Sequence, residues 1–209
     1  RRAGVPRVRG DGRGCDHRLR LRLADADADA LRALVAALGP GNARYVGGAV
    51  RDTLLGITVK DIALATPLVP QDVIARLDAA GIRSVPTGIE HGTVTVVVDH
   101  HPFEITTLRR DTACDGRHAA VEFTDDWAED ARRRDFTINA MSLAPDGTLF
   151  DYHGGLIDAQ AGKVRFVGDP ADRIQEDYLR ILRLFRFQAR YGRSDIDNAT
   201  LEAVRAHVK

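Results

Sequence analysis

Cysteines, long apolar runs and net charge are all scarce in this sequence of 209 residues, and each scarcity excludes a class of protein. The two cysteines, Cys15 and Cys114, are far apart and have no neighbours at metal-ligand spacing, which excludes a disulfide scaffold and a cysteine-based metal site. We interpret them as free thiols in a reducing cytoplasm. The longest apolar candidate, residues 94–98, has the length of a strand and not the roughly 18 residues of a membrane span. We therefore expect a cytoplasmic protein without a membrane segment.

The formal net charge is zero, so the chain as a whole lacks the basic character of many nucleic-acid-binding proteins. The charge is unevenly distributed, because residues 1–22 contain eight arginines against only Asp11 and Asp16. This segment has neither the apolar stretch of a secretory signal nor the serines of an organellar transit peptide. We predict a disordered arginine-rich leader over residues 1–22, with a nucleic-acid-binding arm as the alternative.

What is present is an ordinary globular composition, 44% apolar and 29% charged, with periodic patterns that predict helices and strands. From about residue 23, Leu31, Leu34, Val35 and Leu38 share one helical face, which ends before Gly39. Further helices are predicted before residue 56, over 70–80 and after 170, and strands are predicted at 43–46, 61–65, 82–85, 93–98 and 103–107. Because several strands are sequential neighbours, we predict an α+β fold with a mixed sheet and flanking helices.

Two expectations concern less regular parts of the chain. Residues 109–120 are polar and show little periodicity, which predicts a mobile loop. In the helical region after Pro170, we expect one apolar stripe: Ile174, Leu179, Leu182, Phe185 and Ala189.

The sharpest local signal is the Gly47-Gly48 pair at the end of the first predicted strand. Adjacent glycines at a strand-to-helix turn allow backbone N–H groups to approach an anion, and Arg51 one turn later could clamp phosphate. The alternative is a merely structural tight connection. Downstream, Asp61 and Ala63 lie two apart on a predicted strand and therefore face the same side.

With this spacing, GGAVRDTLLGITVKDIALAT resembles the signature of the tRNA nucleotidyltransferase and bacterial poly(A) polymerase family, within the DNA polymerase β-like superfamily. That family reads Asp-x-Asp where this chain has Asp61 and Ala63. The resemblance implies that Asp61 is a surviving catalytic ligand of Mg²⁺, that Glu104 is a candidate third carboxylate, and that Ala63 occupies the position of the second ligand.

A second segment, RRDFTINAM, resembles the family motif associated with ribose and phosphate contacts. Asp135 and Asn139 are four residues apart and would share one face of a helix, where they could hydrogen-bond ribose hydroxyls. Arg134 could hold phosphate through its planar fork. The alternative is a solvated basic helix start.

The third segment, residues 168–187, resembles the neck-helix motif of class II tRNA nucleotidyltransferases. The resemblance assigns reading of the Watson–Crick edge of the incoming base to Asp177 and Arg180, which suits CTP and ATP. Arg183 and Arg186 follow at three-residue intervals, so we expect all three arginines on one side of the helix, with an exposed ion-pair face as the alternative.

Together the motifs imply a nucleotidyltransferase head over residues 23–160 and a partial helical neck over 161–209, with the family's body and tail domains absent. The implied reaction is CCA addition: the 3′ end of tRNA attacks CTP or ATP with the help of Mg²⁺. Ala63 implies that this chain binds nucleotide but transfers it poorly. The alternatives are CC addition, poly(A) synthesis, or a non-catalytic nucleotide-binding module.

Overall fold

A computed structural model describes residues 19, 21, 25–59, 61–98, 101–114 and 119–208. Apart from Leu19 and Leu21, the predicted leader lies outside the described residues. Among the helices of these residues, none combines the length and apolar character needed to cross a bilayer.

Within the described residues, seven strands form one sheet in the order β3-β4-β5-β2-β1-β8-β9. Their bounds are Arg44–Val46 (β1), Ala63–Thr66 (β2), Ser84–Gly88 (β3), Thr93–Val98 (β4), His101–Thr107 (β5), Ser142–Leu143 (β8) and Leu149–Phe150 (β9). The central β2–β5 pair is parallel and the other pairs are antiparallel. The predicted mixed sheet and α+β class are therefore confirmed.

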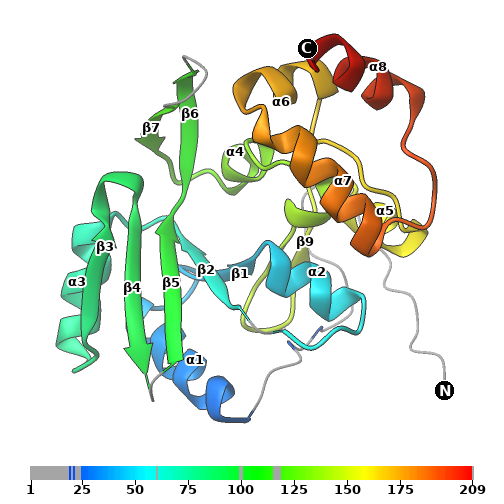
Figure 1. The fold of residues 1–209 in the computed structure, drawn as a ribbon. Helices are drawn as coiled ribbons and strands as arrows, with labels where there is room; N and C mark the ends of the chain where they lie inside the picture. Colours follow the sequence, from blue (N-terminus) through cyan, green and yellow to red (C-terminus); the bar gives the residue numbers. More distant parts are fainter. Residues whose placement is uncertain are drawn as a thin grey trace, which may run out of the picture.

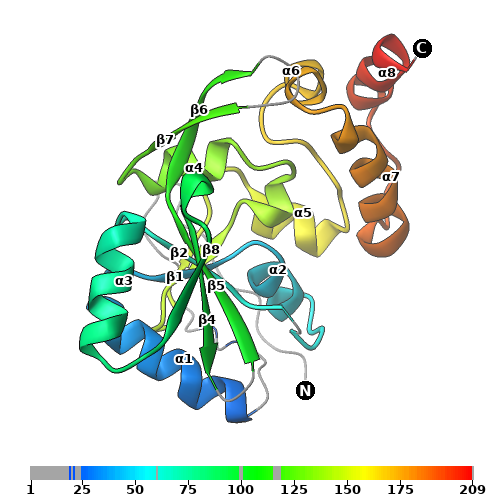
Figure 2. The ribbon, with the colours of Figure 1, turned by 60° about the vertical axis from the view of Figure 1, so that its left-hand side comes forward.

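Helices α1 (Asp25–Leu38) and α3 (Pro70–Ala79) cover one side of the sheet, and α2 (Gly48–Leu54) lies on the other (Figure 2). Leu31, Leu34 and Leu38 are buried in the largest core cluster, as their spacing predicts. This cluster also includes Phe103 and Ile105 of β5, so the central strands are held firmly from one side. The opposite face of these strands carries the side chains of the candidate site.

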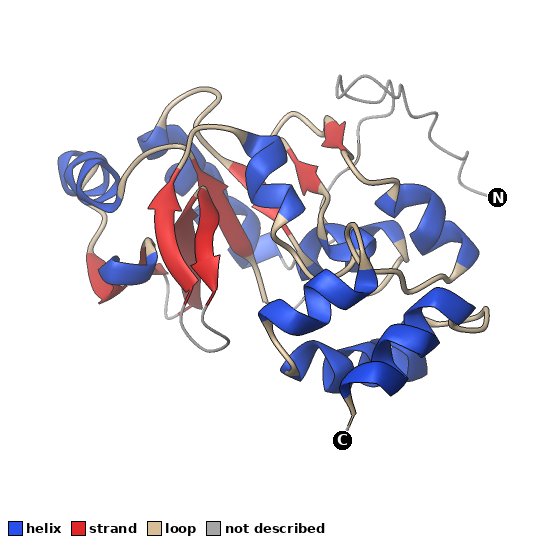
Figure 3. Cartoon of the chain, turned by 90° about the horizontal axis from the view of Figure 1, so that it is seen from above, coloured by secondary structure: helices blue, strands red, loops and turns tan. Residues whose placement is uncertain are grey.

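The C-terminal part of the chain is helical, with α6 (Pro170–Glu176), α7 (Leu179–Tyr191) and α8 (Asn198–His207). These helices gather at one end of the molecule, away from α1 and α3 (Figures 1 and 3). They are joined to the preceding segment by a second core cluster that includes Phe136, Phe166, Leu184 and Phe187. The short helices α4 (Trp127–Arg132), α5 (Gly155–Ala161), η1 (Ile89–His91) and η2 (Thr137–Asn139) complete the fold.

The prediction of a loop over residues 109–120 is wrong for most of that segment. Strands β6 (Arg109–Cys114) and β7 (Ala119–Phe123) pair as an antiparallel hairpin beyond β5 (Figure 1). RRDTAC and AAVEF favour a loop at the sequence level because they lack the alternation that a half-buried strand shows. A two-stranded ladder is held by its backbone hydrogen bonds and does not need that pattern.

The predicted apolar stripe on the C-terminal helices is also wrong. Leu179, Leu182 and Phe185 are 64%, 68% and 47% exposed, and the buried face of α7 is formed instead by Ile181, Leu184 and Phe187. The prediction failed for two reasons. Apolar residues are distributed around most of the circumference of α7, and the helix is interrupted between α6 and α7. At this break Asp177 has extended dihedral angles, so the helical phase of Ile174 does not continue.

Candidate functional site

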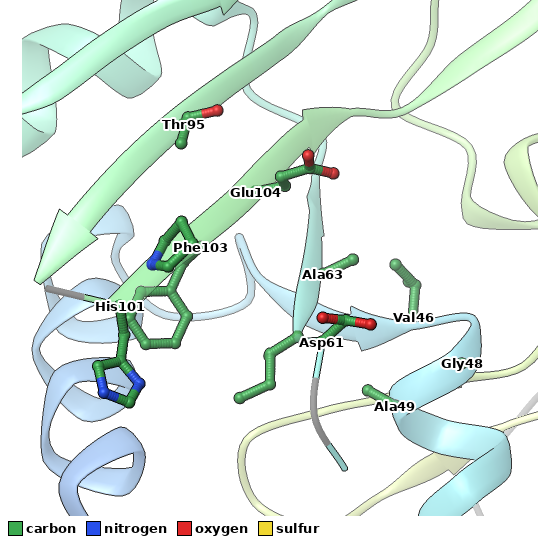
Figure 4. Close-up of a pocket in the computed structure, with 11 residues that line it drawn as sticks. Val46, Gly48, Ala49, Asp61, Ala63, Thr95, His101, Phe103 and Glu104 are labelled. Atoms are coloured by element: carbon green, nitrogen blue, oxygen red, sulfur yellow. The ribbon is translucent and has the colours of Figure 1, made fainter.

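A row of side chains crosses four neighbouring strands at the centre of the sheet. Val46 on β1 is paired with Ala63 on β2, which is paired on its other side with Glu104 on β5. Glu104 in turn pairs with Thr95 on β4. Figure 4 shows the side chains of Asp61, Ala63 and Glu104 on one face, with the methyl group of Ala63 between the two carboxylates.

This row lines a cavity of about 520 Å³, which we call the carboxylate cavity. The side chains of Asp61 and Glu104 are exposed there, and neither has an ion-pair partner among the described residues. In the described part of the chain, no three acidic, histidine or cysteine side chains are grouped to hold a metal ion. The donors at this position are therefore two carboxylates, with a methyl group where the sequence resemblance implies a third.

The Gly47-Gly48 turn lies beside the row, where β1 leads into α2. Gly47 has a φ of 65°, which favours glycine, and it precedes α2 without a side-chain cap. A Cβ atom at Gly47 would lie 3.4 Å from Nη1 of Arg134, and one at Gly48 would lie 3.3 Å from Nη2 of Arg51. The two glycines thus allow two guanidinium groups to approach the turn closely.

A second cavity of about 560 Å³, which we call the arginine cavity, adjoins the first and shares Val46, Gly48 and Ala63 with it. Nine residues that three separate motifs predicted as nucleotide-binding lie on its wall: Gly47, Gly48, Arg51, Arg134, Asp135, Asn139, Asp177, Arg180 and Arg183. The fold therefore gathers segments that are far apart in the sequence around one space.

Arg51 is held inside this wall and is only 7% exposed. Its Nε donates to Oδ1 of Asp52 at 2.8 Å, and its Nη1 donates to Oδ1 of Asn139 at 2.7 Å. The guanidinium also packs over the ring of Tyr191 on α7, 4.2 Å from its centroid. Burial raises the pKa of the Tyr191 hydroxyl, which donates to Asp52 at 3.4 Å. Arg51 therefore connects α2 to α7 in addition to lining the cavity.

Asp135 and Asn139 lie in contact, although only Asn139 belongs to a short 3-10 helix, η2. Nδ2 of Asn139 donates to Oδ1 of Asp135 at 3.0 Å, and Nε of Arg183 donates to Oδ2 of Asp135 at 2.9 Å. A continuous series of hydrogen bonds thus runs from Arg51 through Asn139 and Asp135 to Arg183 on α7. It fixes the position of α7 against the rest of the site.

Asp177 and Arg180 both line the arginine cavity, but they do not share a helical face. Asp177 lies in the extended link before α7, where its Oδ1 accepts from the backbone N–H of Leu179 at 2.9 Å. Arg180 donates to the carbonyl oxygens of Arg173 at 3.0 Å and Arg133 at 3.2 Å, and to the carboxylate of Glu176. These contacts fix the orientation of the guanidinium.

Arg186 was expected on the same side as Arg180 and Arg183, but it does not lie on the cavity wall. Its guanidinium carbon is 5.8 Å from the ring centroid of Phe187. Three residues of an α-helix span about 60° less than a full turn, so each arginine points about 60° away from the preceding one. Arg186 therefore faces a different side from Arg180.

Four residues on the wall were not predicted as site residues: Val46, Arg109, Arg133 and Phe187. Val46 lies on a predicted strand but carries no polar group. Arg109 was missed because it falls in the segment read as a loop. Arg133 is adjacent to Arg134 in the same motif, so a signal for it was available. Phe187 was not recognised because its face of α7 was not expected to be buried.

Comparisons with known proteins find relatives of this chain by sequence and by fold. Human CCA tRNA nucleotidyltransferase 1, mitochondrial, is 53% identical over 172 residues, covering 79% of this chain and 39% of the human protein. The crystal structure of Bacillus stearothermophilus CCA-adding enzyme in complex with CTP matches with a TM-score of 0.76 and 33% identity, covering 88% of this chain and 44% of that chain. A tRNA nucleotidyltransferase complexed with a primer tRNA and an incoming ATP analog matches with a TM-score of 0.64 and 31% identity, covering 79% of this chain and 46% of that one.

The chain thus spans less than half the length of these relatives. The Poly A polymerase head domain family matches residues 43–165, which include the carboxylate row, the Gly47-Gly48 turn and the RRDFTINAM motif. This match covers more than half of the chain, and the protein belongs to that family.

Proposed function

We propose that the protein is the head of a cytoplasmic nucleotidyltransferase that takes CTP and ATP and extends the 3′ end of tRNA, the activity called CCA addition. The observation that carries this proposal is the junction of the two cavities at Val46, Gly48 and Ala63. There, a space surrounded by arginines opens onto a row of carboxylates. The relatives solved with CTP, and with a primer tRNA and an ATP analog, support this choice of substrates.

The triphosphate belongs in the arginine cavity, whose wall carries six arginines and two aspartates. Such an excess of positive charge attracts a polyanion. We assign the role of principal phosphate ligand to Arg134, because its Nη1 lies beside the Gly47-Gly48 turn, where β1 leads into α2. Arg51 supports the turn instead of binding phosphate directly, since most of its donors are used by Asp52 and Asn139.

The base belongs at the neck end of the same cavity. Asp177 supplies an acceptor for the exocyclic amino group of cytosine or adenine, and Arg180 supplies donors for ring nitrogen and carbonyl oxygen. UTP and GTP would leave these groups without complementary partners. We assign Asp135 and Asn139 to the ribose hydroxyls, because their hydrogen bonds join Arg51 to Arg183 on the same wall.

Asp61 and Glu104 are the residues that would hold Mg²⁺. Their hard oxygen donors fit this ion, which commonly binds through one or two carboxylates together with substrate phosphates and water. A bound ion would activate the 3′-hydroxyl and neutralise charge on the departing pyrophosphate. The hydroxyl oxygen attacks the α-phosphorus, and the bond between that phosphorus and the oxygen bridging to the β-phosphate breaks. Ala63 removes one ligand from this arrangement, so we expect nucleotide binding with slow transfer.

The proposal is tested by incubating the chain and its Ala63→Asp variant with a tRNA that lacks its 3′ end, Mg²⁺ and each labelled nucleotide in turn. We expect incorporation of CMP and AMP but not UMP or GMP, with more product from Ala63→Asp. Sequencing the product distinguishes CCA addition from CC addition and poly(A) synthesis. Absence of product from both proteins, also after each is joined to the C-terminal part of the human relative, would contradict the proposal.

A second candidate function, a non-catalytic nucleotide-binding module, is favoured by the methyl group between Asp61 and Glu104. This function predicts that CTP binds while Ala63→Asp restores no transfer. The two candidates are therefore separated by the same incubation together with a CTP titration.

A further inference from the structure

Asp130 is a buried carboxylate next to the arginine cavity but not on its wall. It lies on α4, is 4% exposed, and precedes Arg133 and Arg134 by three and four residues. Its Oδ1 accepts from Nε of Arg133 at 2.9 Å, and its Oδ2 accepts from Nη2 of Arg134 at 3.0 Å. Oδ1 also lies 3.3 Å from the backbone N–H of Arg109 at the base of the β6–β7 hairpin. One carboxyl group thus contacts three residues of the cavity wall.

The two arginines are held in a forked manner. Nη2 of Arg133 is 2.8 Å from Oδ1, in addition to its Nε, and Nε of Arg134 is 3.3 Å from Oδ2, in addition to its Nη2. Each guanidinium therefore uses one edge for Asp130 and keeps its Nη1 for another partner. For Arg134, this remaining Nη1 is the atom that lies beside Gly47.

The carboxyl group stays charged in its buried position. Burial alone raises its pKa, but the charges of Arg134 and Arg133 and their hydrogen bonds outweigh burial and lower the pKa below its ordinary value. A buried charge of this kind is costly to form and is tolerated where it is fully paired. Asp130 is therefore ionised throughout the neutral range and fixes both guanidinium groups.

We propose that Asp130 is a positioning residue, which presents Arg133 and Arg134 to the triphosphate of the incoming nucleotide. This inference rests on the proposed function, because it names how the phosphate end of that site is organised. Without the carboxylate, two adjacent flexible cations would repel each other and spread over many rotamers. With it, they form a fixed pair before the nucleotide arrives.

The chain offers a matched control on the same helix. Asp126 caps α4 by accepting from the backbone N–H of Ala128 at 2.7 Å and makes no contact with either arginine. Asp126→Ala therefore weakens the helix without releasing the guanidinium groups. Asp130→Asn releases them, because an amide has one acceptor oxygen and no charge.

The experiment is a calorimetric titration of CTP and CMP against the parent chain and these variants, with thermal melting of each protein. For Asp130→Asn, we expect CTP affinity to fall by about tenfold to a hundredfold, as when one charge-assisted phosphate contact is lost. CMP affinity should fall by no more than about threefold, and Asp126→Ala should leave CTP affinity within the same range. In a chain that already carries Arg133→Ala and Arg134→Ala, adding Asp130→Asn should not lower CTP affinity further, because neither guanidinium group remains to be positioned.

Equal losses of CTP and CMP affinity, or a loss reproduced by Asp126→Ala, would show a general structural role and overturn the inference. Unchanged CTP affinity in a folded Asp130→Asn protein would overturn it as well. If Asp130→Asn melts below the assay temperature, Arg134→Lys takes its place, because lysine keeps the charge but cannot form the fork. Unchanged CTP affinity in that variant counts equally against the inference. A parent chain that binds no CTP contradicts the proposed function itself, and this inference fails with it.

Discussion

The two cavities that meet at Val46, Gly48 and Ala63 differ in how their charged groups are held. Around the arginine cavity, most guanidinium groups have fixed partners: Asp130 holds two, Asp135 holds one, and Asp52 with Asn139 holds another. In the carboxylate cavity, Asp61 and Glu104 are exposed and have no such partners among the described residues.

In the proposed function, this difference separates nucleotide binding from catalysis. The arginine cavity is preorganised by the protein, so its shape depends on many mutually supporting contacts. The carboxylate row is positioned by the register of the sheet, and in the proposed function a cation would complete it. A change from aspartate to alanine at position 63 would leave the fold and the arginine cavity intact while removing a ligand. The following predictions test this separation.

The largest effect is expected at position 63. Ala63→Asp should raise transfer of CMP to tRNA by about a hundredfold or more, because a charge partner of the transition state worth several kcal/mol is regained. The rate is measured in single turnovers with labelled CTP, using the chain joined to the C-terminal part of the human relative. Ala63→Asn is the matched control, since it has the same shape without the charge and should not restore transfer. Equal gains from both variants would remove the metal-ligand explanation.

The next effect is expected at Arg51, which belongs to the preorganised cavity. Arg51→Ala should weaken CTP and ATP alike, each by about tenfold, because Arg51 supports the Gly47-Gly48 turn at the phosphate end of the cavity, and contacts there carry no information on the base. It should also lower the melting temperature by on the order of 5 °C, since Asp52 and Asn139 lose their buried partner. Nucleotide titrations and thermal melting measure the two effects. Weaker binding of only one of the two nucleotides would show that Arg51 does not act at the phosphate end of the cavity.

A more selective effect is expected at Asp177. Asp177→Ala should compress the preference for CTP and ATP over UTP and GTP by about tenfold, because the amino group of the base loses its acceptor. Affinity for inorganic triphosphate should barely change. Asp197→Ala is the control, since Asp197 likewise accepts from a backbone N–H at the start of a helix, α8. Uniformly weaker binding of all four nucleotides would show that Asp177 stabilises the start of α7 and does not read the base.

The smallest effect is expected at His153, which lines neither cavity. Burial lowers the pKa of His153, and Arg132, Arg165 and Arg173 act in the same direction, while Asp151 opposes them. The unfolded chain takes up a proton near the ordinary pKa of histidine, so this contribution to stability is present above about pH 6.5 and is lost as the pH falls through the lowered value. His153→Gln should therefore reduce the drop in melting temperature between about pH 7.5 and pH 5.5. CTP binding should be unaffected by this change, because His153 lines neither cavity.

Local patterns were enough to predict much of the fold and the composition of the site. The two-residue period placed Asp61 and Ala63 on one side, and the Gly47-Gly48 pair indicated a turn that side chains would obstruct. The position of Glu104 opposite Ala63 depends on the parallel pairing of β2 with β5, which skips two intervening strands. No local pattern contains that information.

The partners of the arginines were beyond prediction for a similar reason. Arg51 and Asn139 are 88 residues apart, and Arg183 and Asp135 are 48 apart, so only the folded chain shows that they pair. Arg133 and Asp130, by contrast, have the three-residue spacing of neighbours on a helix and could have been found. The buried face of α7 was misread because its apolar residues do not occupy a single stripe.

The central claim is that the arginine cavity decides nucleotide binding and position 63 decides transfer. Its most direct test measures two quantities in the same two proteins, the parent and Ala63→Asp: the dissociation constant of CTP and the single-turnover rate at saturating CTP. We expect Ala63→Asp to transfer CMP about a hundredfold faster than the parent, while the dissociation constants of CTP differ by no more than about threefold. A change in affinity as large as the change in rate, or a parent chain that does not bind CTP, would contradict it.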